Sequence, residues 1–327
     1  MRLVVQSFTG VTPTRPIGMP SKWAADGEFV VSDQAANRHP GVTVSYALPA
    51  GPLRRYASTY SQTVVDPETP TVFDQVYPEW PNIRMTVGGD MAACTGPGPL
   101  KACNPICAIG PTSHATHFSL APGRYWTVSL LPLGWARFIG IPACEFADRW
   151  EVISRDSPFA AFAPLLACDK AGDDFANAAA RIDAHLLAML NRPARGEDTI
   201  LRAHGALLDP EVTSVTAFAE RTGIGVRALE RLSVAAFGFS PKLLLRRQRF
   251  LRSLAQFMLD PSLAWIDTLD GQYVDQAHFI RDFRRFMDTT PGAYAAAPHP
   301  VLWAAAEART AVAGKPMQVL QLQSEVA

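Results

Sequence analysis

The chain has 327 residues with no formal net charge, 48% of them hydrophobic and 18% charged. This composition excludes an intrinsically disordered chain and is typical of a folded globular protein. A net charge of zero also excludes a general electrostatic attraction to nucleic acid, so any basic surface must be local.

The length is enough for two domains of roughly 100–200 residues each. No apolar run approaches the roughly 20 residues of a membrane-spanning helix, and the N-terminus becomes polar too early for a signal peptide. Five cysteines without a secretory signal indicate a reducing cytoplasm and no disulfide framework. We therefore expect a cytoplasmic protein of bacterial type with no membrane contact.

The first half of the chain shows the pattern of a β-rich domain. Residues 1–40 have few periodic apolar positions and predict an irregular N-terminal arm. Residues 41–165 contain short β-like runs bounded by glycine or proline, which favours an antiparallel sandwich or barrel. A helical corner over residues 133–148 closes this domain. The predicted strands are 42–48, 84–87, 106–109, 117–120 and 125–131.

Residues 166–196 form a predicted linker with one helix, 173–190. Its apolar residues Phe175, Ile182 and Leu186 follow helical spacing. This apolar stripe has two candidate partners, the first domain or a second copy of the chain.

Residues 197–298 are predicted to be entirely helical. Gly223 stands where a helix C-terminal cap is expected, and only a short turn separates it from the helix that starts at Val226. Ser240-Pro241 then supplies an N-cap and a proline in the first turn of a long helix.

After Pro261 the pattern repeats. Leu263, Ile266 and Leu269 are periodic and predict a helix that ends at Gly271, and Asp275 caps the next helix. Thr290-Pro291 begins a short final helix. Residues 299–327 are rich in alanine and then in glutamine, valine and leucine, which predicts a weakly ordered tail.

Within this helical region the positive charge is concentrated in one segment. Between residues 221 and 252 the only acid is Glu230. The basic residues there are Arg221, Arg227, Arg231, Lys242, Arg246, Arg247, Arg249 and Arg252.

Five motifs over about residues 197–296 carry a family resemblance. They are Leu229-Glu-Arg-Leu, Phe237-Gly-Phe-Ser-Pro-Lys, Arg249-Phe250, Tyr273-Val-Asp-Gln-Ala-His-Phe-Ile-Arg-Asp-Phe-Arg-Arg-Phe and Thr290-Pro-Gly-Ala-Tyr. With them the chain resembles the AraC/XylS family of transcriptional regulators. Residues 118–143 are similar to the N-terminal sensory domain of a family subgroup, which is thought to be a cupin-like β fold.

The resemblance implies an α+β multidomain fold. A β-rich, cupin-like N-terminal domain precedes an all-α domain in which a long helix joins two helix-turn-helix motifs. The implied function is sequence-specific binding of double-stranded DNA across adjacent major grooves, controlled by a small molecule or partner acting on the first domain. RNA polymerase and a second copy of the chain are further partners that the family allows.

The major groove admits one helix, whose outward polar side chains reach the base edges. In the first motif Leu229 and Leu232 must face the core, and in the second Phe279 and Phe283 must do so. The candidates for reading bases are Arg227, Glu230, Arg231, Gln276 and Arg281. The candidates for phosphate contacts, which position without specifying, are Lys242, Arg246, His278, Arg284 and Arg285.

Simpler interpretations exist for several of these residues. Taken alone, Arg227, Arg231 and Arg281 are better explained as solvated charges on helix surfaces, and only the whole family pattern favours DNA contact. Arg247 and Arg249 are expected to form intramolecular ion pairs. The chain also departs from the family at Ser233, where an aromatic residue is usual, and at 267–272, where a small apolar run is usual.

A second cluster defines an alternative function. Cys94, Cys103 and Cys107 lie in a Gly/Pro-rich stretch, followed by His114 and His117, and both residue types bind zinc. Their spacing matches no zinc motif, but it leaves open a metal- or thiol-dependent sensor or enzyme. No nucleophile elbow, phosphate loop or paired-carboxylate motif is present. We therefore expect no enzymatic activity, cofactor or metal. A third alternative is a DNA-binding protein whose first domain only oligomerises.

Overall fold

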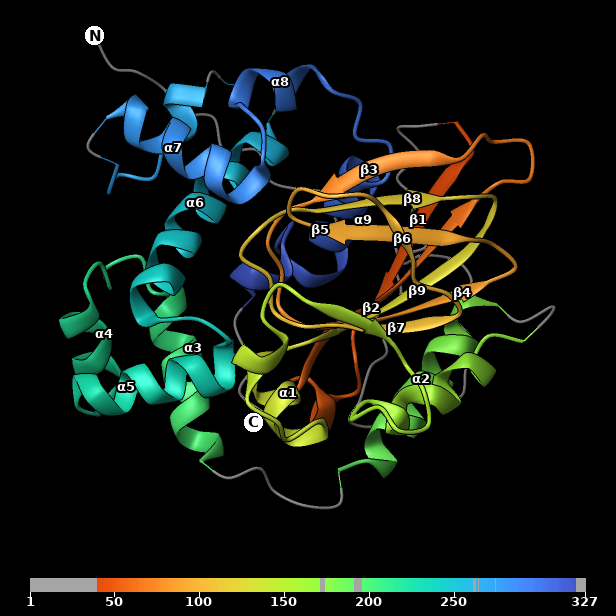
Figure 1. The fold of residues 1–327 in the computed structure, drawn as a ribbon, viewed down its shortest axis with the longest axis horizontal. Coiled ribbons are helices and arrows are strands. Elements are labelled where there is room, and N and C mark those ends of the chain that lie inside the picture. The colour runs from red at the N-terminus through yellow and green to blue at the C-terminus, as the bar shows by residue number, and fades with distance from the viewer. Residues whose placement is uncertain are drawn as a thin grey trace, which may run out of the picture.

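The computed structural model describes residues 40–170, 174–190, 196–260, 263, 265–273 and 275–321 (Figure 1). The predicted N-terminal arm lies outside these residues except for Pro40. Figure 1 shows a β domain on one side and a helical domain on the other. The predicted α+β fold class is confirmed.

The β domain consists of two antiparallel sheets. In spatial order the six-stranded sheet holds β1 (Val42–Ala47), β2 (Ala57–Val65), β9 (Gly123–Leu130), β4 (Asn82–Val87), β7 (Ile106–Ile109) and β10 (Trp150–Val152). The four-stranded sheet holds β3 (Val72–Val76), β8 (Thr116–Leu120), β5 (Met91–Thr95) and β6 (Lys101–Ala102). All five predicted strands are present. Strand β2 was not predicted, because its side chains are largely buried on both faces and show no alternation of polar and apolar residues.

Four short helical segments of the described chain belong to the β domain. They are η1 (Gly51–Leu53), α1 (Pro132–Phe138), η2 (Ala143–Phe146) and η3 (Ala160–Ala167). Helix α2 (Phe175–Ala188) packs on this domain with Ile182 and Leu186 fully buried. The buried carboxylate of Asp183 fastens the helix, since it accepts hydrogen bonds from the Tyr60 hydroxyl at 2.6 Å and the Ala50 amide at 2.9 Å. Of the two predicted partners for this helix, the first domain is the one observed.

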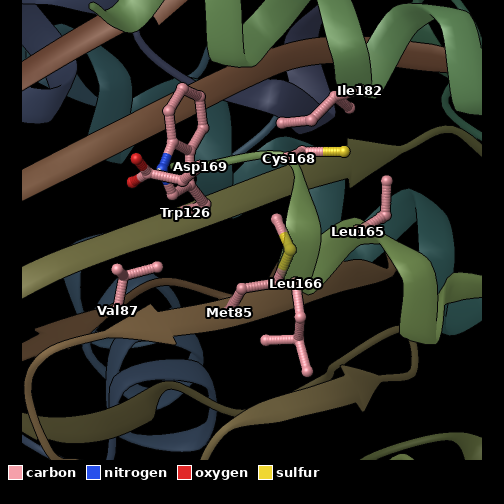
Figure 2. A pocket seen from close by; sticks show the side chains of 8 residues that line it. All are labelled: Met85, Val87, Trp126, Leu165, Leu166, Cys168, Asp169 and Ile182. Carbon is pink, nitrogen blue, oxygen red and sulfur yellow. The ribbon is translucent and has the colours of Figure 1, made fainter. Parts of the chain in front are cut away.

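Beside α2, a small recess lies between the six-stranded sheet and η3 (Figure 2). The Trp126 indole nitrogen donates to the Asp169 carboxylate at 2.7 Å, and Figure 2 shows the two side by side. The recess has an empty volume of about 200 Å³ and no space for a water molecule. The recess is therefore a packing defect between layers rather than a ligand site.

The helical domain is built around one long helix, α6. Phe250 of α6 is fully buried, and its ring centroid lies 5.4 Å from that of Phe283 and 5.1 Å from that of Phe286. The helices are α3 (Glu197–Leu208), α4 (Val215–Thr222), α5 (Val226–Leu232) with a π turn η4 (Ser233–Phe237), α6 (Pro241–Leu259), α7 (Gln276–Met287) and α8 (Pro291–Ala296). Because α4 ends at a predicted cap and α6, α7 and α8 begin at predicted caps, local sequence signals account for this part of the fold.

The helix predicted to end at Gly271 is shorter than expected. Its described residues form only a 3-10 turn, η5 (Trp265–Thr268). The reason lies in Asp270, whose carboxylate accepts from the Gln272 amide at 3.0 Å and from Arg252 Nε at 2.5 Å. An aspartate that bonds the backbone two residues ahead forms a turn that competes with helix.

The prediction of a weakly ordered tail after residue 298 is wrong for its described part. Helix α9 (Leu302–Ala313) and the 3-10 turn η6 (Gln318–Leu320) pack between the β domain and α6. Leu302 and Val319 are buried. Composition did not reveal this, because an alanine-rich helix gains its stability from the surfaces that it meets and not from its own pattern.

Candidate nucleic-acid interface

The first helix-turn-helix presents α5 with its polar residues outward. Gly223 has a φ of 74° and ends α4, a left-handed conformation that glycine adopts without strain. The Leu229 side chain is fully buried, while Arg227, Glu230 and Arg231 are exposed. The predicted base-reading candidates of this motif therefore lie together on the solvent face of one short helix.

The second motif presents α7 in the same way. The Asp275 carboxylate caps it by accepting from the His278 amide at 2.6 Å. Phe279 and Phe283 are fully buried, and Gln276 and Arg281 are exposed.

Helix α6 joins the two motifs and is the element that sets their separation. Its 19 residues span about 28 Å at 1.5 Å per residue. Adjacent major grooves on one face of DNA repeat at about 34 Å. The length of α6 thus suits two helices that enter neighbouring grooves.

A buried carboxylate, Asp282, fixes α7 on α6. It has no exposed surface, and it accepts from Arg246 Nε at 2.5 Å, Arg249 NH2 at 3.3 Å and the Tyr273 hydroxyl at 3.0 Å. Burial raises the pKa of Tyr273, and Asp282 raises it further, which keeps the hydroxyl a donor. Arg249 is paired as predicted. Arg246 shares this pair, which makes it a weaker candidate for phosphate contact.

The remaining phosphate candidates differ in accessibility. Lys242, Arg284 and Arg285 are exposed. His278 is half-buried, and its Nε2 lies 3.2 Å from Arg249 NH2. Sequence reasoning missed Asp282. Its position three residues after Phe279, on the buried face of α7, was the only available signal.

The β domain holds the helical domain through Arg247, a fully buried residue of α6. Its guanidinium carbon lies 3.9 Å from the Trp80 ring centroid, and its Nη1 donates to the Thr112 carbonyl at 2.8 Å. Burial lowers the pKa of Arg247 to about 9, and nearby Asp148 acts in the opposite direction. The prediction of an intramolecular ion pair for Arg247 is therefore replaced by a cation–π contact with the other domain.

Residues 111–115 of the β domain contact both helix-turn-helix motifs. Gly238, which follows the first motif, lies against Pro111. At the end of α7, the Ala115 amide donates to the Phe286 carbonyl at 2.7 Å, and His114 Nδ1 lies 3.3 Å from the Asp288 carboxylate. This loop links the β domain to both motifs at once.

The cysteine and histidine cluster does not assemble into a metal site. In the described part of the chain, no three His, Cys, Asp or Glu side chains are placed to hold a metal ion. The interaction between the two thiols lowers the pKa of Cys103 and raises that of Cys107. Cys94 lies on β5, half-buried, and His117 lies on β8, also half-buried. The structure thus lends no support to the metal- or thiol-dependent alternative.

Two helices that expose polar residues on one scaffold define the class of the protein, which has a double helix-turn-helix. Residues 218–297 match a family model described as a helix-turn-helix domain. The predicted helix-turn-helix domain is thereby confirmed for the C-terminal region. No curated protein matches the chain in sequence.

Among solved structures, ToxT from Vibrio cholerae O395 is similar with 9% identity, 69% of this chain and 96% of that chain covered, and a TM-score of 0.38. The AraC-like transcriptional activator CuxR is similar with 12% identity, 71% and 88% coverage, and a TM-score of 0.29. The ribosomal oxygenase YcfD from Escherichia coli reaches 8% identity, 55% and 59% coverage, and a TM-score of 0.23. All three TM-scores are below 0.5, so these similarities do not indicate an activity for this chain.

Among the described residues, no helix is both long and apolar enough to cross a membrane.

Proposed function

We propose that the protein is a sequence-specific DNA-binding transcriptional regulator that places α5 and α7 in adjacent major grooves. One observation carries this proposal: two helices, α5 and α7, expose polar residues on one scaffold, and the helix that joins them, α6, is nearly as long as one helical turn of DNA.

In this proposal the arginines have the leading roles. The forked guanidinium of Arg227, Arg231 or Arg281 suits guanine, because it donates to O6 and N7 together. Glu230 suits cytosine N4, and Gln276 suits adenine. Lys242, Arg284 and Arg285 contact phosphates and set the register.

The β domain supplies control. A small molecule or partner that binds one arrangement of the two domains better than another shifts DNA binding, as linkage requires. The contacts of Arg247 with Trp80 and Thr112 support such coupling, since they tie the scaffold of both readers to the β domain. RNA polymerase and a second copy of the chain are partners consistent with this function.

The test is a selection of binding sites from random DNA duplexes with the full chain, followed by affinity measurements on the selected duplex. Arg227→Ala combined with Arg281→Ala removes two bidentate contacts of about 1–3 kcal/mol each, so the affinity falls roughly 30-fold or more. Arg155→Ala combined with Lys101→Ala is the control, because it removes the same charge from exposed sites of the β domain, outside both helix-turn-helix motifs. Unchanged protection of the selected site by the first variant would refute the proposal.

A further inference from the structure

The segment after the second helix-turn-helix, residues 299–321, runs between the two domains and is called the strap below. Its N-terminal end is held by Asp74 of β3. The Asp74 carboxylate accepts from the amides of Val301 and Leu302, both at 2.9 Å, and its other oxygen lies 3.0 Å from His299 Nδ1. Because Asp74 and His299 are both buried, this anchor is shielded from water.

Further contacts fasten the strap along the β domain. Gln318 Nε2 donates to the Leu130 carbonyl of β9 at 2.6 Å, and the Tyr77 hydroxyl donates to the Pro316 carbonyl at 3.3 Å. Arg309 of α9 reaches β2, where NH1 donates to the Thr59 hydroxyl at 2.5 Å. The strap therefore forms hydrogen bonds with residues of three strands of the β domain, β2, β3 and β9.

The other side of the strap holds α6. Gln248 Nε2 of α6 donates to the Val319 carbonyl at 2.8 Å, and the Phe257 and Trp303 ring centroids lie 6.1 Å apart. Since α6 carries both helix-turn-helix motifs, a strap bonded to α6 and to the β domain sets where both readers lie.

In this arrangement α5 lies beside the β domain. An open hollow of about 430 Å³ separates them, lined by Pro142 and Cys144 on one side and by Glu230, Arg231, Val234 and Ala235 on the other. A helix with its side chains is about 10–12 Å across and fills a major groove about 12 Å wide. Glu230 and Arg231, two of the candidates for reading bases, line this hollow, so η2 stands on the side of α5 that DNA approaches in the proposed function.

We propose that the strap is an intramolecular latch that holds α5 beside η2 and thereby lowers the affinity of the chain for DNA. This inference rests on the proposed function. Release of the strap from the β domain frees the helical domain to move away from η2, so that both readers engage adjacent grooves.

The latch is poised for release because one of its anchors is costly. Arg309 is only 2% exposed, and the acceptors of its hydrogen bonds, Thr59 Oγ1 and Gln321 Oε1, are uncharged. Burial lowers the pKa of Arg309, and the nearby groups Tyr46, Tyr77 and Glu79 oppose this effect without cancelling it. A buried charge bonded to neutral groups offsets part of the stability that the other anchors provide.

The test uses the full chain in two measurements. Asp74→Ala removes the N-terminal anchor, and Gln75→Ala, its neighbour on β3, is the control. Gln248→Met removes the α6 anchor with little change in volume, so a second variant remains if Asp74→Ala does not fold. Hydrogen exchange is measured without DNA over residues 233–248 and 302–320. Affinity is measured on duplexes selected from a random pool by the wild type and by each variant.

We expect faster exchange in both segments and DNA affinity at least about 5-fold higher for Asp74→Ala and Gln248→Met, the lower end of typical coupling between sites. A duplex bound only by these variants supports the latch in its strongest form. Unchanged exchange overturns the strap as a restraint, and faster exchange with unchanged or weaker affinity overturns inhibition. Faster exchange with no duplex bound by any protein overturns the proposed function and still supports the restraint.

Discussion

Asp282→Ala is the substitution that most directly tests how α7 is held. The fully buried carboxylate accepts from two arginines and a tyrosine, Arg246, Arg249 and Tyr273. Without it, these three donors lose their common acceptor, and nothing else in this cluster of four residues accepts in its place. We expect the α6–α7 unit to open more easily while the rest of the chain stays folded.

The magnitude follows from burial. Removing one partner of a buried ion pair costs about 3–5 kcal/mol. Here the Arg246 side chain is 36% exposed and Arg249 is 17% exposed, so both recover part of their hydration and the cost falls to about 2–3 kcal/mol. At about 1.36 kcal/mol per factor of ten, amide exchange in α7 then rises roughly 30- to 150-fold.

Hydrogen exchange resolved to residues 276–287 is the appropriate assay, because two domains need not unfold in a single transition. Glu220→Ala is the matched control: it removes one acidic charge from an exposed position in α4. Asp282→Asn keeps one acceptor oxygen and is expected to give a smaller rise. Equal exchange in Asp282→Ala and Glu220→Ala would show that the buried cluster does not position α7.

Gly238→Ala should destabilise the contact between the first motif and the β domain by about 2 kcal/mol, since left-handed backbone alone costs an alanine about 1–2 kcal/mol. The position has a φ of +85°, and an added Cβ would meet Pro111 Cγ at 2.5 Å. The control is Gly225→Ala, because a Cβ added at Gly225 meets nothing within 4 Å. Urea unfolding compares the two variants, and equal midpoints would contradict the predicted destabilisation. Burial, with a contribution from Asp90, raises the pKa of Tyr125 to about 12. Between pH 10 and 12 the unfolded chain loses this proton first, so the stability that the hydroxyl contributes is present below pH 10 and is lost as the pH approaches 12. From pH 10 to 12, the unfolding free energy of the wild type should therefore fall relative to that of Tyr125→Phe. A difference between the two that stays constant over this range would contradict the raised pKa of Tyr125.

Much of the helical domain was predictable because its signals are local. Ser240, Asp275 and Thr290 each accept from the amide three residues ahead, and such caps are readable within one turn of sequence. The outward placement of Arg227 and Arg281 follows from the apolar residues beside them on the same helix.

The β domain was predictable only in part. Strands with one exposed face show alternation, as β1 does, but a strand buried on both faces, such as β2, does not. The second motif also differed from expectation, because Asp270 bonds the backbone and Arg252 rather than continuing a helix.

The sequence by itself determined where α5 and α7 begin and end and which side of each faces outward, because caps and apolar stripes act over a few residues. Only the tertiary structure decided the partners of the charged residues and the place of the strap. Arg247 bonds Thr112 across 135 positions of sequence, and Arg309 bonds Thr59 across 250. A buried cation needs acceptors that the fold brings to it from far along the chain, and no local pattern records which ones they are.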